Sequence, residues 1–196
     1  YFQMSKLTHE DLYSLEKYAG IRNEFRSKVM EHKKNRRVAI GAHAALYFED
    51  QLTMQYQVQE MLRIERIFEA EGIQDELDVY NSLIPDGLNW KATFMIEYED
   101  VEERRQALAR MIGIERSLWV QVEGFDKVSP IANEDLERET EDKTSAVHFV
   151  RFELTPEMAA AVKQGTGIKA GIEHPAYSGE TTLSAGIHDS LSGDLH

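Results

Sequence analysis

Cysteine is absent from this 196-residue chain, and its absence excludes several kinds of chemistry. Without thiols the protein forms no disulfides, holds no thiolate zinc site or iron–sulfur cluster, and has no cysteine nucleophile. A metal would need its ligands from the seven histidines and from the carboxylates. Such ligands favour iron, manganese, zinc or magnesium over softer ions.

Long apolar runs are also missing. No stretch approaches the run of about 18 apolar residues that spans a bilayer, and the residues after Met4 are polar rather than a secretory signal. We therefore predict a cytoplasmic protein without a membrane partner. Residues 1–3 match the remnant of an expression tag, residues 4–191 are expected to form one domain, and residues 192–196 are expected to be a flexible tail.

Basic residues are few, 22 against 35 acidic ones, and the net charge of −13 argues against nucleic-acid binding. The segment Arg22–Arg37 nevertheless carries a net charge of +5, which leaves −18 for the rest of the chain. This separation of charge predicts either self-association, as in a homodimer, or an anionic ligand at the basic end. The residues expected to bind such a ligand are Arg26, Lys33, Arg36 and Arg37. The alternative is a solvated helix end, because basic side chains suit C-terminal carbonyls.

Helical and strand-like patterns are mixed along the chain without regular alternation. We predict an α+β fold in which four to six helices pack on a mostly antiparallel sheet. Thr8 and Asp11 resemble a capping box before a first helix over residues 9–19, which Gly20 is expected to end. The strands are expected near Val38, Ala44, Phe94, Val120, Phe149 and Ile172.

The longest helical pattern runs from Met54 to Glu71. At about 100° per residue its apolar side chains cover so wide an arc that we predict a helix packed on two sides. Glu65 falls within the apolar stripe, and a buried carboxylate needs a partner because an isolated buried charge is too costly. We predict a buried polar network that provides a ligand or a base, formed by Gln57, Glu60, Arg63 and Glu65. The alternative is a structural ion pair between Glu65 and an arginine such as Arg26 or Arg151.

Histidine offers another candidate site. His43 lies in a predicted turn, His148 in a predicted strand and His174 before a proline. If these three side chains converge with Glu65, they form a metal site for iron, manganese or zinc. Structural or exposed histidines are the alternative.

Motifs of established enzyme classes are missing. The chain has no phosphate-binding loop, no GxGxxG, HExxH or GxSxG motif, and no Glu-x-x-His pair on the central helix. The sequence therefore points to no particular reaction.

Several segments together resemble a known family. HKKNRR is followed by FEDQLTMQYQVQEMLRIERIFE, LIPDG, TSAVHFVRFELTPEM and HPAY. These segments resemble the bacterial family called domain of unknown function 3501, from Met4 to about Leu191. The resemblance implies a bacterial protein often encoded beside a rubrerythrin-like protein and an iron–sulfur oxidoreductase of the heterodisulfide-reductase type. It implies no activity and no catalytic residues.

Two functional hypotheses follow. The first is an accessory protein of an iron-dependent redox or oxidative-stress system, which binds a protein partner or a small anionic ligand. The second is a metal-dependent enzyme with histidine and carboxylate ligands.

Overall fold

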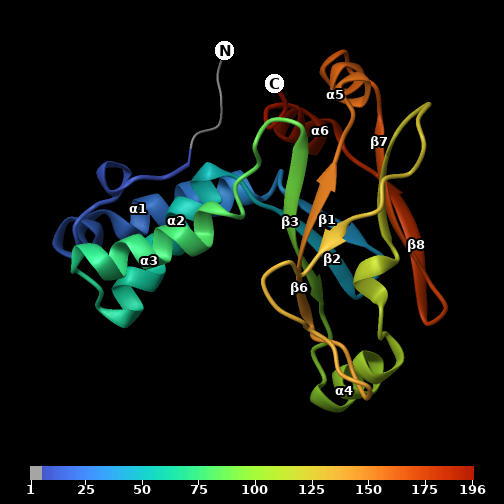
Figure 1. The fold of residues 1–196 in the computed structure, drawn as a ribbon, viewed down its shortest axis with the longest axis horizontal. Helices are drawn as coiled ribbons and strands as arrows, with labels where there is room; N and C mark the ends of the chain where they lie inside the picture. The colour runs from blue at the N-terminus through green and yellow to red at the C-terminus, as the bar shows by residue number, and fades with distance from the viewer. Residues whose placement is uncertain (1–5) are drawn as a thin grey trace.

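The computed structural model describes residues 6–196, so the expected tag remnant lies outside the described residues. This part of the chain contains six α-helices and two antiparallel sheets, which confirms the α+β prediction. The single expected sheet is in fact two. Figure 1 shows helices α1, α2 and α3 as a lobe on one side of the two sheets.

The larger sheet has five strands in the order β1-β2-β3-β6-β5, and every neighbouring pair is antiparallel. Its strands are β1 (Arg37–Ile40), β2 (Ala44–Phe48), β3 (Asn89–Ile96), β6 (Val147–Glu153) and β5 (Ile131–Ala132). The smaller sheet has the order β4-β7-β8, also antiparallel. Its strands are β4 (Leu118–Val122), β7 (Ile168–His174) and β8 (Tyr177–Thr182).

The main core lies between these sheets. Alternate residues of β3 and β6 are buried, as a half-buried strand requires. One hydrophobic cluster contains Leu46 and Phe94 of the larger sheet together with Val120 and Ile172 of the smaller. The remaining helices border the sheets: α4 (Val101–Arg110), α5 (Pro156–Lys163) and α6 (Ala185–Ser192).

The lobe has its own smaller cores. It consists of α1 (Leu15–Lys33), α2 (Gln51–Glu65) and α3 (Ala70–Asn81). Met54, Val58 and Leu62 of α2 pack with Leu77 of α3, whereas Tyr56 packs with an aromatic group on α1. None of the helices in residues 6–196 has the length and apolarity needed to cross a bilayer.

Two helix boundaries differ from the predictions. Gly20 does not end a helix, because α1 runs through it and buries Tyr18, Phe25 and Val29. Glycine inside a helix costs about 0.5–1 kcal/mol relative to alanine, and this packing offsets the cost. The predicted Met54–Glu71 helix is broken at Arg66, which adopts the left-handed conformation with φ 54° and caps α2.

The C-terminal residues are packed into the fold, so the predicted flexible tail is wrong. Asp194 and Leu195 are 2% and 3% exposed. The His196 N–H donates to the carbonyl of Gly87 at 3.0 Å.

The side chain of Arg36 connects this C-terminal segment to the residues just before α2. Its side chain is 2% exposed and donates to both carboxylate oxygens of Asp194, at 3.1 and 2.7 Å. The same guanidinium donates to the carbonyls of Phe48 and Glu49, at 3.1 and 2.9 Å. Arg36 therefore joins three chain segments that are far apart in sequence.

We predict that Arg36→Ala lowers the free energy of unfolding by about 3–5 kcal/mol, because it leaves the buried Asp194 carboxylate without its partner. Urea unfolding measures this change. Arg26→Ala, at an exposed arginine of α1, is the control and should stay within about 0.5 kcal/mol of the unchanged protein. The double variant R36M/D194L should recover most of the loss, and equal destabilisation by both arginine variants would contradict the prediction.

Candidate functional site

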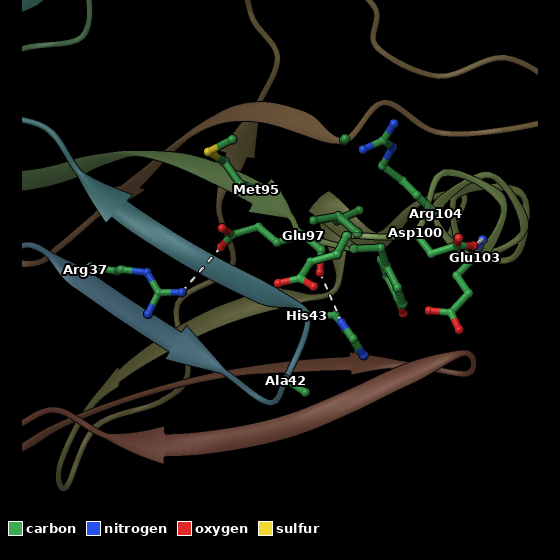
Figure 2. Close-up of a pocket in the computed structure, with 12 residues that line it drawn as sticks. Arg37, Ala42, His43, Met95, Glu97, Asp100, Glu103 and Arg104 are labelled. Atoms are coloured by element: carbon green, nitrogen blue, oxygen red, sulfur yellow. Dashed lines mark hydrogen bonds and ion pairs between the residues drawn. The ribbon is translucent and has the colours of Figure 1, made fainter.

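A cavity of about 760 Å³ lies where the β1–β2 turn meets the end of β3 and the start of α4. Figure 2 shows His43, Glu97 and Glu103 around it. Its lining consists of Arg37, Ala42, His43, Met95, Ile96, Glu97, Tyr98, Glu99, Asp100, Glu103, Arg104 and Ala146. Two residues predicted to belong to separate sites, Arg37 and His43, therefore line one cavity.

The β1–β2 turn fixes His43 in this cavity. Gly41 adopts φ +70°, and a Cβ there would lie 2.5 Å from the hydroxyl of Tyr177. Glycine thus permits both the turn and the close approach of the tyrosine. The Tyr177 hydroxyl donates to the carbonyl of Ile40 and accepts the backbone N–H of His43.

The imidazole of His43 is held in one orientation. Its Nδ1 lies 3.0 Å from the carbonyl oxygen of Glu97, and its ring stacks on Tyr98 with centroids 3.9 Å apart. A carbonyl only accepts, so Nδ1 carries a proton, and in the neutral ring Nε2 then presents a lone pair. Nε2 has no hydrogen-bond partner among residues 6–196, and Figure 2 shows it directed away from Glu97.

The charged groups of the cavity divide into paired and unpaired ones. The carboxylate of Glu97 accepts from Arg37 at 3.4 Å and from the hydroxyl of Tyr47 at 3.2 Å. The hydrogen bond with Tyr47 and the nearby Glu97 raise the pKa of Arg37, against the effect of burial. Neither Glu99 nor Glu103 forms an ion pair with another described residue. The cavity therefore offers free acceptors beside an arginine that is already engaged.

The start of α4 places two of these carboxylates. The side chain of Asp100 accepts the N–H of Glu103 at 2.8 Å and caps the helix. This cap holds Glu103 in the first turn of the helix, and Glu99 lies just before it. The approach of this turn to His43 could not be read from the sequence.

The rest of the predicted basic site is dispersed. Arg36 is buried in the ion pair with Asp194. Arg26 is exposed on α1, and Lys33 lies over the ring of Tyr56, 5.6 Å from its centroid. The predicted anion-binding group of Arg26, Lys33, Arg36 and Arg37 is therefore wrong as a single site.

The predicted buried network on the central helix is also wrong. Glu65 and Arg63 are exposed, because α2 ends at Glu65 and the apolar stripe does not continue past it. Glu60 instead bonds residues of α1: it accepts from Arg22 at 2.7 Å and from the Tyr18 hydroxyl at 2.9 Å. The hydrogen bonds from Arg22 lower the pKa of Glu60. Gln57 is half-buried and belongs to no such network.

The three predicted histidine ligands do not converge with Glu65. Within residues 6–196 no three histidine, aspartate or glutamate side chains lie close enough together to hold a metal ion. His148 is buried in the core, and its Nε2 lies 2.9 Å from the carbonyl of Ser145. His174 Nε2 lies 2.8 Å from the carbonyl of Ile112. Both are structural histidines.

Fold and cavity together define an α+β protein with an open polar cavity around one oriented histidine. The chain belongs to the family DUF3501, described as protein of unknown function, whose model matches residues 6–195. It is also similar to a crystal structure of a novel protein of unknown function from Burkholderia pseudomallei K96243. The two are 48% identical, with a TM-score of 0.93 over 98% of this chain and 100% of the other. Comparison with curated proteins gives no match.

We predict that Glu60→Ala lowers the free energy of unfolding by about 2 kcal/mol, because it removes charge-assisted hydrogen bonds between α1 and α2. Glu65→Ala, five residues along the chain, should change it by less than about 0.5 kcal/mol, since its side chain is exposed. Thermal and urea unfolding of both variants measure the difference. A larger loss for Glu65→Ala than for Glu60→Ala would contradict this assignment.

Proposed function

We propose that this protein is an accessory binding protein of an iron-dependent redox system, and that it binds a partner through the His43 cavity. The redox association comes from the family resemblance, which implies rubrerythrin-like and iron–sulfur oxidoreductase neighbours. The chain has no cysteine with which to ligate a cluster itself. A role in binding a redox partner is consistent with both points.

The oriented, unpartnered Nε2 of His43 is the observation that carries this proposal. Around it lie the carboxylates of Glu99 and Glu103, which also form no ion pair within the described residues. All these groups accept hydrogen bonds. The complementary group is a cation with several N–H donors, such as a lysine or arginine side chain on a partner's surface.

The geometry favours a cationic group over the small anionic ligand. Among the described residues, Arg37 and Arg104 are the arginines that line the cavity, and Arg37 is engaged by Glu97. Acidic residues at the rim steer a basic partner and repel an acidic one. The metal-dependent enzyme is less well supported, because His43 has no second and third ligand beside it among the described residues.

Binding to the rubrerythrin-like protein and to the iron–sulfur oxidoreductase, measured separately by calorimetry at low salt, tests the proposal. The triple variant H43A/E99Q/E103Q should bind its partner at least about tenfold more weakly, because the cavity loses its acceptors. Binding by the unchanged protein should also weaken as salt is raised, since exposed charges are screened.

Glu102→Gln is the matched control for this experiment. Glu102 lies on the same helix turn but pairs with Arg105 and does not line the cavity. It should bind within about twofold of the unchanged protein. Equal binding by the triple variant would exclude the cavity as the interface, and no binding to either protein would exclude the proposed partners.

A further inference from the structure

A second group of charged side chains lies at the other end of α4, in the turn η2 (Ile114–Arg116) and the acidic segment of residues 133–146. Glu115 of this turn is 2% exposed. Arg116 donates to Glu115 Oε1 at 3.1 Å and to Glu139 Oε1 at 2.8 Å. One guanidinium therefore binds two carboxyl groups. Its single positive charge can balance the charge of only one of them.

The second oxygen of Glu115 is closed to solvent and accepts no hydrogen bond from an N–H or O–H group of the described residues. A water molecule or a ligand cannot reach it without movement of the chain. The carboxyl of Glu139 contacts the same guanidinium as Glu115, so two carboxyl groups depend on one cation. A buried carboxylate oxygen without a donor is costly, and a proton on the carboxyl removes that cost. This geometry favours one proton on the pair.

Glu139 connects the acidic segment to the turn. Its Oε2 accepts the N–H of Gly113 at 3.1 Å, in addition to the bond from Arg116. The segment is also attached near both ends, where Glu134 pairs with Arg151 at 2.7 Å and the Thr144 N–H donates to the carbonyl of Leu108 at 3.0 Å. Between these attachments Arg138 lies over the ring of Phe149. Loss of the Glu139 contacts would therefore loosen the middle of the segment.

We propose that Glu115, Arg116 and Glu139 form a proton-operated latch. It holds the middle of residues 133–146 on η2 while the two carboxyl groups share a proton, and it loosens this part of the segment when the proton is lost. A lost proton leaves two carboxylates on one exposed arginine, and like charges in contact repel. The buried carboxylate of Glu115 would also lack a hydrogen bond to one oxygen, which is costly. Opening of the segment removes both the repulsion between the carboxylates and the cost of the missing hydrogen bond.

The direction of the pH dependence follows from the two carboxyl groups. Burial raises the pKa of Glu115, and the nearby Glu139 adds to this effect. The hydrogen bond from Arg116 lowers the pKa of Glu139. Glu115 therefore stabilises the closed segment at acid pH, and this contribution is lost as pH rises through its raised pKa. Glu139 stabilises the closed segment above its lowered pKa, and this contribution is lost as pH falls through that pKa.

Other charged groups near Glu115 act differently. His148 on β6 approaches within 3.9 Å, and burial lowers its pKa. Arg138 of the acidic segment is bonded to Asp135. Neither group forms a hydrogen bond with Glu115 among the described residues, so a Glu115 variant is aimed at the proposed proton.

Amide hydrogen exchange of residues 133–146 between pH 4 and 8, compared at each pH with that of Glu115→Gln, tests the latch. The glutamine is permanently neutral and donates to Glu139. Protection in the unchanged protein should fall relative to the variant as pH rises above the ordinary glutamate pKa near 4.3. The fall should be up to about tenfold per pH unit and should stop at the raised pKa of Glu115, above which the ratio stays level. Comparison at equal pH cancels the intrinsic pH dependence of exchange.

Two further variants complete the test. Glu137→Gln is the matched control, because Glu137 belongs to the same segment, lines a cavity together with Glu115 and Glu139, and forms no ion pair among the described residues; it should follow the unchanged protein. Glu139→Gln should weaken the pH dependence, because it removes the nearby charge while the burial of Glu115 remains, and it serves if Glu115→Gln does not fold. A constant ratio between the unchanged protein and both variants across this pH range would overturn the proposal.

Discussion

The arrangement of the lobe and the sheets depends on the buried contact between Arg36 and Asp194. Arg36 follows the end of α1, its carbonyl partners are the last residue of β2 and the residue after it, and Asp194 lies after α6. Burial raises the pKa of Asp194 to about 6 even though Arg36 is beside it. At Arg36, in contrast, burial acts to lower the pKa, but the nearby carboxylates, chiefly Asp194, together outweigh burial and raise the pKa. The pair adds little net stability, but loss of either partner leaves a buried charge, so the contact selects one arrangement of three segments.

Asp50 extends this contact to the start of α2. Its side chain caps the helix through the N–H of Thr53 at 3.0 Å and lies 3.7 Å from Arg36. His32 of α1 bonds the same carboxylate at 2.6 Å. Although burial opposes it, the hydrogen bond from His32 and the charge of Arg36 lower the pKa of Asp50. These contacts fix α1 and α2 to the larger sheet where the helices join it. The far end of the lobe carries exposed apolar side chains such as Phe68, which is 74% exposed.

Local patterns predicted the elements whose signals lie within a few residues. The capping box of Thr8 and Asp11 is present, and strands contain Val38, Phe94 and Phe149 as their local patterns indicated. The break at Arg66 gave no such signal, because a left-handed residue at a helix end is usually glycine or asparagine. The helical pattern was consequently extended through Glu65, which assigned a buried role to an exposed side chain.

Contacts between distant residues could not be read from spacing. Arg36 and Asp194 are 158 positions apart, and the basic run around Arg36 resembled an exposed helix end. His43 was a candidate, but its partner Tyr177 belongs to a strand 134 positions away. The sequence thus supplied residue types for the cavity, whereas the sheets decided which of them meet.

The two polar sites lie at opposite ends of the helix α4, and their glutamates lie in different surroundings. Its first turn contributes Glu103 to the open His43 cavity, and its last turn accepts the Thr144 N–H of the acidic segment through Leu108. Ala146, the last residue of that segment, lines the His43 cavity. Carboxylates at the open end are exposed to water and suit a cationic partner, whereas at the closed end Glu115 is buried, which favours its protonated form. Because one short helix carries both contacts, release of the acidic segment removes a support from the same element that forms the rim of the cavity.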